Sequence, residues 1–246
     1  MKKYFLTNSV IFPLLCSLLL VLVGCSTEEI SLESSTDDLE TTATHEGDNT
    51  LDDVGAKGVP KFNLFHPTRG TNASIKNDRF FNRSGRTHKF YLPKGIINKK
   101  VSRKHARIEA SQTSGRWGPG RKNHSFEATF SVSTTLPKQV TILQQFAVSK
   151  GPQTRIEIRK NGDLKAAFSD GKPVTLAKKG EYNRDNFKVK IVTNGKVTSV
   201  FLNGKKKVNN KKVRFKSKTN QFRWGLYYNT KPPKAIRSTV KNINVN

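Results

Sequence analysis

The chain has 246 residues, and its 45 Lys and Arg against 18 Asp and Glu give a formal net charge of +27 at pH 7. The charge is split: residues 26–56 hold ten acidic residues and no Lys or Arg, whereas residues 57–246 hold 43 of the basic residues and eight acidic ones. Self-repulsion of this size disfavours a compact state, so a folded basic block indicates a polyanionic partner. The two cysteines lie at positions 16 and 25, which excludes disulfide, Cys-metal and Cys-nucleophile chemistry from the basic block.

The N-terminus has the pattern of an export signal. A basic Met1-Lys2-Lys3 start precedes a short apolar run that ends before Gly24 and Cys25, which predicts a signal peptide over residues 1–24. Small residues before a Cys resemble a bacterial lipoprotein box, which implies lipidation of Cys25. The acidic residues that follow resemble the surface-export signal of Bacteroidetes lipoproteins, so we expect an outer-membrane lipoprotein exposed at the cell surface. A plain signal peptide with an incidental Cys is the alternative.

Residues 25–56 are predicted to form an acidic flexible tether. They are rich in Ser, Thr, Asp and Glu and poor in aromatic residues. Such a stretch cannot bury enough apolar surface to become ordered. The lipid at Cys25 is then expected to hold the membrane, and the acidic tether avoids the polyanion that the basic domain binds.

Residues 57–246 suit one domain with one core. Apolar residues alternate along residues 126–132, 140–146, 187–191 and 197–202, a period typical of half-buried strands. Asn-Gly pairs at 161–162, 194–195 and 203–204 predict type I′ hairpins, and Asp170-Gly171 a further turn. We therefore predict an all-β jelly roll, a concanavalin-like sandwich of two antiparallel sheets with a concave polymer-binding face. Residues 57–88 are less regular and are expected to wrap the edge.

The first candidate strand for that face is 103–111. One side of it is polar and mostly basic: Arg103, His105, Arg107, Glu109 and Ser111. Arginine suits carboxylate or sulfate groups on a sugar chain because its planar fork contacts two oxygens at once. The alternative is an ordinary solvated strand face.

Two further strands carry polar residues at alternate positions. In residues 141–146, Gln144 and Gln145 interrupt an apolar strand, and buried amides need partners, so one is expected to be structural and one to donate to a substrate carboxylate. Val140, Ile142, Gln144 and Phe146 are expected on one face. In residues 222–229 the shared face holds four residues: Arg223, Gly225, Tyr227 and Asn229. Gly225 is expected to open space for a ligand beside the phenol; core or edge packing of the tyrosine is the alternative.

These strands, in this order, resemble the alginate lyase and glucuronan lyase group of β-jelly-roll polysaccharide lyases over residues 80–246. Arg107 and Glu109 match the first two positions of an Arg-Glu-Arg alternation, and Ser111 replaces the last. Gln144-Gln145-Phe146 stands at a Gln-Ile/Val-His motif, without its His. Residues 223–229 match a Lys-Ala-Gly-Val-Tyr-Asn-Gln motif in charge, Gly and Tyr, and Val197–Lys206 resembles the penultimate hairpin of these enzymes.

The resemblance implies β-elimination on a uronic-acid polysaccharide. The C5 proton is lost beside the carboxylate and the group on C4 leaves, so the enzyme must neutralise that carboxylate, supply a base and protonate the leaving oxygen. By resemblance, Arg107 and Gln144 neutralise the carboxylate. Tyr227 acts as acid, or as acid and base, while Arg223 and Asn229 orient the sugar. Arg103, Glu109 and Gln145 complete the expected substrate-binding set.

Phe146 at the family's His position leaves the base open among three alternatives. Tyr227 makes both proton transfers, its pKa lowered by surrounding Lys and Arg. Another histidine stands in, for which His105 is the first candidate before His88 and His124. In the third alternative the domain has lost catalysis.

The leading function is a lyase for ulvan, alginate, glucuronan or a glycosaminoglycan, and the alternative is a non-catalytic module that binds such a polymer. A glycoside hydrolase needs two positioned carboxylates, and no such cluster stands among the eight acids of the domain. A nucleic-acid partner fits the charge but not export, and no nucleic-acid motif is present. We expect a monomer without a cofactor; a Ca²⁺ site built from scattered oxygens is left open.

Overall fold

The computed structural model describes residues 56–98, 104–133, 138–214 and 217–246. These residues form fifteen β-strands and no helix. The strands are β1 (Phe62–His66), β2 (Gly70–Ala73), β3 (Phe81–Ser84), β4 (Thr87–Leu92), β5 (Ala106–Gln112), β6 (His124–Val132), β7 (Val140–Ala147), β8 (Gly151–Ile158), β9 (Leu164–Phe168), β10 (Val174–Ala177), β11 (Phe187–Thr193), β12 (Val197–Leu202), β13 (Lys205–Lys212), β14 (Asn220–Tyr228) and β15 (Ile236–Val245). Within these ranges no helix is long and apolar enough to span a membrane.

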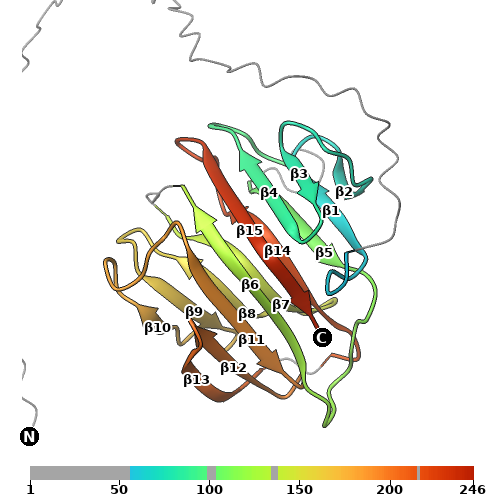
Figure 1. Ribbon diagram of the computed structural model, residues 1–246, viewed down its shortest axis with the longest axis vertical. Helices are drawn as coiled ribbons and strands as arrows, with labels where there is room; N and C mark the ends of the chain where they lie inside the picture. The colour runs from blue at the N-terminus through green and yellow to red at the C-terminus, as the bar shows by residue number, and fades with distance from the viewer. Residues whose placement is uncertain (1–55, 99–103, 134–137, 215–216) are drawn as a thin grey trace, which may run out of the picture. The chain divides into compact units, whose positions relative to one another are not determined.

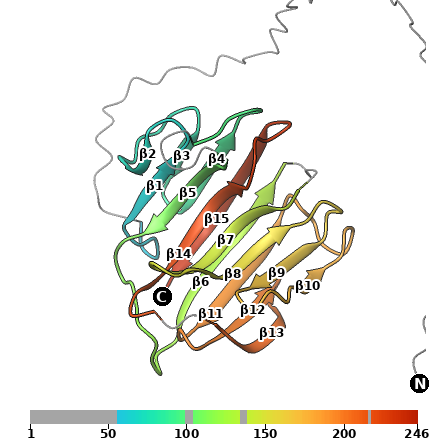
Figure 2. The same cartoon turned by 180° about the vertical axis from the view of Figure 1, so that it is seen from behind.

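Two antiparallel sheets pack face to face, which confirms the predicted sandwich (Figures 1 and 2). One sheet has eight strands in the order β10-β9-β8-β7-β14-β5-β1-β2, and we call it the site sheet because it contains the candidate strands 103–111, 141–146 and 222–229. The back sheet has seven strands in the order β13-β12-β11-β6-β15-β4-β3. β14 and β15 are consecutive in sequence but lie in different sheets, so the C-terminal strands cross the middle of the sandwich.

The core lies between the two sheets and is rich in aromatic rings. β6 contributes the residues that the alternation predicted, and all are fully buried: Phe126, Ala128, Phe130 and Val132. Trp224 of β14 packs against Phe126 and Phe62, and its indole N–H donates to Nδ1 of His88 on β4, 3.0 Å away. This bond gives the buried indole a partner and ties the two sheets together.

The Asn-Gly pairs lie in turns, but only one has the expected hairpin geometry. Asn203 and Gly204 join β12 to β13 with φ of 48° and 80°, the positive pair that a type I′ turn requires. At 161–162 and 194–195 only the glycine has positive φ. There the asparagine side chain caps the turn instead: Asn161 Oδ1 accepts from the amide of Asp163.

Residues 57–88 lie at the sheet edges, as expected: β1 and β2 at one edge of the site sheet, and β3 with β4 at one edge of the back sheet. They form short strands of four to six residues, with a register shift between β1 and β2. The expected alternation along residues 140–146 was wrong. In β7 the register shifts between Thr141 and Leu143, so Ile142 occupies a bulge and the alternation changes phase. As a result Gln144 and Phe146 do not share a face with Val140, and Leu143 takes the core position.

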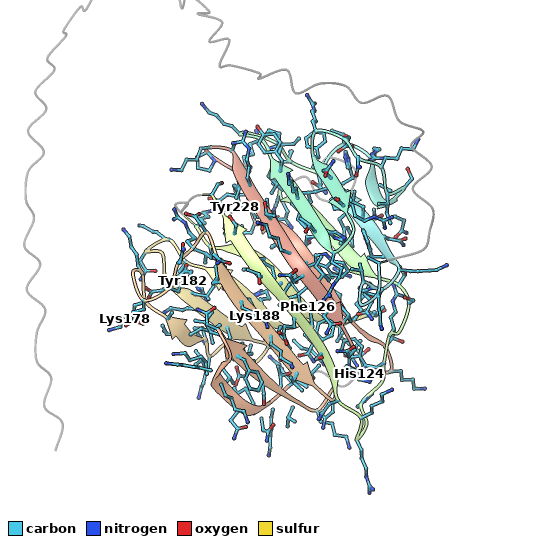
Figure 3. The ribbon with its side chains drawn as sticks, viewed as in Figure 1. His124, Phe126, Lys178, Tyr182, Lys188 and Tyr228 are labelled. Atoms are coloured by element: carbon cyan, nitrogen blue, oxygen red, sulfur yellow. The ribbon has the colours of Figure 1, made fainter. Side chains whose placement is uncertain are left out.

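Basic side chains lie on both sides of the sandwich. Figure 3 labels Lys178, which follows β10 of the site sheet, and Lys188, which lies on β11 of the back sheet. Charge alone therefore does not identify a binding face, and the arrangement of particular groups must do so.

Candidate active site

Three neighbouring strands of the site sheet bring the predicted residues together. On β14, Tyr227 pairs with Arg107 of β5 on one side and with Thr141 of β7 on the other. Two residues earlier in β14, Gly225 pairs with Glu109. These residues alternate with buried core positions, so they lie on the outer face of the sheet.

A second row crosses the same strands. Arg223 of β14 lies between Ser111 of β5 and Gln144 of β7. The row continues to Arg155 of β8, which pairs with Gln144. Arg107, Gln144, Arg223 and Tyr227 are thus brought onto one face of adjacent strands, as the motif order predicted.

The phenol of Tyr227 has a titratable partner. Its hydroxyl lies 3.1 Å from Nδ1 of His105, the residue that precedes β5, and the two rings meet edge to face at 5.4 Å between centroids. Burial, and then the charges of Arg107 and Lys104, lower the pKa of His105, so a neutral imidazole is available at pH 7. The hydroxyl can then donate to Nδ1, and the imidazole can accept its proton.

The pKa of Tyr227 moves in the direction opposite to our expectation. Burial raises the pKa of the phenol, and the positive charge of Arg107 opposes that rise without cancelling it. The expectation of a lowered pKa counted the basic neighbours and omitted the desolvation of a half-buried ring. Tyr227 is therefore a neutral phenol at pH 7, suited to give a proton and in need of an acceptor before it can take one.

Cations and rings alternate along this face. The guanidinium of Arg107 lies 4.7 Å from the ring centroid of Tyr227 and 5.0 Å from that of Phe65 on β1. The guanidinium of Arg223 lies 4.8 Å from Phe65 on one side and 3.5 Å from Phe146 on the other. The rings hold both cations in place by cation–π attraction while leaving their N–H groups for an anion.

Burial lowers the pKa of Arg223 to about 10, an effect partly opposed by the carboxylate of Glu109. The guanidinium therefore stays charged at neutral pH. A desolvated cation of this kind attracts an anion more strongly than an exposed one does, because less water screens it.

Glu109 lies beneath the cations and is 2% exposed. Its Oε1 accepts from Nε2 of Gln144 at 2.5 Å, and its Oε2 lies 3.7 Å from Nε of Arg107, an ion pair too long for a hydrogen bond. This contact turns the Gln144 amide and supports Arg107. We therefore assign Glu109 to positioning, where the sequence suggested direct substrate binding.

Several buried polar atoms at this place lack a hydrogen-bond partner among the described residues. They are Nε of Arg107, Nε of Arg223 and Oε2 of Glu109. Buried unpartnered polar groups are rare in folded proteins and mark strain or a ligand site. The two arginine N–H donors among them are available to an anionic substrate.

The remaining predicted residues lie elsewhere. Arg103 lies outside the described residues. Asn229 follows the end of β14 and is exposed. His88 is fully buried between the sheets, where burial lowers its pKa to about 3, and His124 stacks on Trp117 at 4.8 Å. Of the three candidate histidines, only His105 contacts Tyr227.

Gln145 does not belong to the substrate-binding set. Its side chain is fully buried and points between the sheets, where Nε2 donates to Gln153 and to Thr193 and Oε1 accepts from Thr198. The bulge in β7 causes this, since it directs Gln144 outward and Gln145 inward. Of the two amides, Gln145 is the structural one.

Gly225 serves packing, where we expected room for a ligand. Its φ is +133°, and a Cβ atom placed there would lie 2.4 Å from the carbonyl oxygen of Ile108 and 3.0 Å from the ring of Phe90. The glycine lets β14 approach β5 closely beside the paired residues Tyr227 and Arg107. The glycine therefore fixes the spacing between β14 and β5, the strands that carry Tyr227 and Arg107.

The sequence reasoning missed two contributors. Phe65 packs against both arginines. The alternation of the apolar residues Phe62 and Leu64 was the sequence signal that places position 65 on the opposite face of the strand. Glu157 of β8 is 1% exposed and binds Arg155 at 2.7 Å and Arg159 at 2.9 Å. Its alternation with Ile156 and Ile158 was also visible in the sequence.

A family model described as alginate lyase matches residues 58–246. The chain belongs to the alginate lyase family. This family consists of polysaccharide lyases, so the chain is a polysaccharide lyase and its substrate is an anionic polysaccharide. No curated protein sequence matches it.

Solved structures share the fold. Alginate lyase AlgAT5 of polysaccharide lyase family 7 is 19% identical with a TM-score of 0.61, over 75% of this chain and 93% of the other. Alginate lyase PA1167 from Pseudomonas aeruginosa is 20% identical with a TM-score of 0.60, over 75% and 97%. The family 7 alginate lyase AlyA1 from Zobellia galactanivorans is 20% identical with a TM-score of 0.56, over 71% and 83%. These similarities support the jelly-roll architecture.

Metal-ligating residues do not cluster in the described ranges. No group of three or more His, Cys, Asp or Glu there could hold a metal ion. The carboxylates near the site are instead bound by cations, as for Glu157 and Glu109.

Proposed function

We propose that this lyase cleaves an alginate-type uronate polymer by β-elimination at Tyr227. The contact of the Tyr227 hydroxyl with His105, next to the stacked cation of Arg107, is the observation that carries this proposal. The family match and the alginate lyases that share this fold support alginate as the first polymer to test. Ulvan, glucuronan and glycosaminoglycans are the other candidates that the high positive charge favours.

The carboxylate of the sugar would lie against Arg107 and the amide of Gln144. Their N–H groups neutralise the charge that otherwise prevents loss of the C5 proton. One N–H of the Gln144 side-chain amide donates to the carboxylate of the buried Glu109. The other N–H of that amide is free to donate to the carboxylate of the sugar.

The proton transfers start from the contact between the neutral phenol of Tyr227 and the neutral imidazole of His105. Tyr227 passes its hydroxyl proton to Nδ1 of His105, and the phenolate then takes the C5 proton. The C4–C5 double bond forms as the C4–O bond breaks, and Tyr227 gives its proton to the leaving oxygen. His105 finally returns the stored proton to the phenolate, which restores both groups.

The alternative is a module that binds the same polymer without cleaving it. Incubation with alginate, glucuronan, ulvan, heparin and chondroitin sulfate, followed by the ultraviolet absorbance of the new unsaturated uronate, distinguishes the two. We expect absorbance to rise with alginate and to be lost in Tyr227→Phe, while the variant still binds the polymer. Binding without any rise in absorbance on any of these polymers would leave only the binding module.

We infer further that the enzyme works outside the cell on a lipid anchor at Cys25. The signal-like residues 1–24 and the acidic stretch 25–56 support this, and all of them except Ala56 lie outside the described residues. The measurement is the membrane fraction of a Cys25→Ala variant expressed from the full chain. Loss of membrane association is expected; unchanged association would contradict a lipid anchor at this cysteine.

A further inference from the structure

A second basic cleft lies on the site sheet, away from Tyr227. It has a volume of about 650 Å³ and is lined by residues of the β7, β8 and β9 ends: Lys138, Gln139, Arg159, Lys160, Asn161 and Lys165, beside one proline. Four of these are cations and none is a carboxylate. We call this the distal cleft, and its volume lies within the range of small-ligand sites.

Strand register places the distal cleft in line with the active site. Tyr227 of β14 pairs with Thr141 of β7, Thr141 with Glu157 of β8, and Glu157 with Lys165 of β9. Lys165 alternates with the buried Leu164 and Ala166, so it lies on the same outer face as Tyr227. Three strand spacings separate the two residues, about 14 Å.

The cations of the distal cleft differ in whether they are paired with a carboxylate. Arg159 is bound to Glu157 at 2.9 Å. In the described part of the chain no ion pair joins Lys138, Lys160 or Lys165 to a carboxylate. The carboxylate of Asp163 lies near Lys165 and offsets part of its charge, while it also accepts from the Asn161 amide and from the backbone of Lys179. No carboxylate lines the cleft itself, so the three lysines present a net positive charge to it.

The back sheet offers a useful contrast. A cleft of about 290 Å³ there is also lined by lysines, Lys188 and Lys190, but both bind Glu127. Glu127 offsets one of these two positive charges and itself lines the cleft, so an anion gains less there. Of these two clefts, the distal cleft has the larger excess of positive charge and is therefore the better site for an anion.

We propose that the distal cleft is an accessory subsite that binds an acidic group on a sugar several units from the cleaved bond. This inference rests on the proposed function, and it identifies the substrate as a long chain with acidic groups on successive sugars. The carboxylate of a remote uronate, or a sulfate, would lie among Lys138, Lys160 and Lys165. A chain that spans both places crosses β14, β7, β8 and β9.

The test uses the double variant Lys160→Gln/Lys165→Gln, which leaves Arg159 and its bond to Glu157 intact. The variant removes two charges that would contact the polymer in a solvent-accessible cleft, so we expect KM for polymeric alginate to rise about tenfold. The KM and kcat for the shortest alginate oligosaccharide that is cleaved should stay unchanged. The matched control is Lys89→Gln/Lys241→Gln, which removes the same charge from exposed positions on β4 and β15 of the back sheet.

Two outcomes would overturn the subsite. One is an unchanged KM for the polymer in Lys160→Gln/Lys165→Gln. The other is an equal rise in the control, which would show a general effect of net charge. Binding of alginate to the full chain carrying Tyr227→Phe, measured by calorimetry with and without the two Gln substitutions, tests the subsite without turnover. Absence of cleavage would therefore count against the proposed reaction alone, whereas equal calorimetric affinities would count against the subsite.

Discussion

His105 should control turnover through the phenol of Tyr227. The perturbation is His105→Gln, which removes the imidazole 3.1 Å from the Tyr227 hydroxyl and leaves the stacking of Arg107 on that ring in place. A positioned base or acid contributes about 10² to 10⁴ in rate. We expect the lower end, a loss of about 100-fold in kcat or about 2.7 kcal/mol, because the phenol itself keeps its position.

The pH profile separates proton transfer from packing. Because the pKa of His105 is lowered below 6.5, its neutral form is present above that lowered pKa and is lost as the pH falls through it. Activity of the wild type should therefore fall on an acid limb that lies below pH 6.5. In His105→Gln this limb should disappear while KM changes little. The assay is initial rate by ultraviolet absorbance across the pH range.

A histidine control comes from the same chain. His124 also has a pKa lowered by burial, but it stacks on Trp117 and does not contact Tyr227. His124→Gln should keep both kcat and the acid limb. If His105→Gln retains kcat within a few-fold together with an unchanged acid limb, the assignment of His105 as the proton acceptor of Tyr227 is wrong.

Three further substitutions test the surroundings of the site. Phe146→Ala removes the ring 3.5 Å from the Arg223 guanidinium, a contact worth up to about 2 kcal/mol. KM should therefore rise by up to about thirtyfold, and an unchanged KM would contradict the stacking role. Gly225→Ala places a Cβ 2.4 Å from a carbonyl oxygen of β5 and should cost about 3 kcal/mol or more in urea unfolding, which wild-type stability would disprove. Gln145→Ala leaves buried hydroxyl and amide partners unpaired and should lower the free energy of unfolding by about 3 kcal/mol while the folded fraction keeps its kcat.

Period-two alternation was sufficient to predict the fold. Phe126 to Val132 alternate over a full strand, and the structure buries the apolar member at each step. The same rule failed in β7 because one extra residue at Ile142 reverses the face of everything after it. Nothing in the local composition of residues 140–146 marks that bulge, since it arises from pairing with β14 and β8.

The sequence was sufficient to predict which strands carry the site. It was not sufficient to predict which side chains contact one another there. Arg107, Gln144, Arg223 and Tyr227 share a face because cross-strand register follows from the sheet order. Phe65 comes from β1, which is distant in sequence from β14, so its contacts with both arginines depend on long-range topology. The pKa direction of Tyr227 likewise depends on burial, which charge counting along the chain does not reveal.

The two departures from the family motifs can be explained together. At the histidine position of the Gln-Ile/Val-His motif, Phe146 stacks on Arg223. Arg223 lies opposite Ser111, the position at which the Arg-Glu-Arg motif has its second arginine. The motifs have one cation on β5 and one on β14 at this pair of positions. This chain has only Arg223 of β14, which lies between the rings of Phe65 and Phe146. The proton acceptor then cannot come from position 146, and the imidazole nearest the phenol is that of His105. The double variant His105→Gln/Phe146→His examines this directly: recovery of activity toward that of the wild type is expected, and activity no higher than that of His105→Gln alone would show that the two positions are not interchangeable.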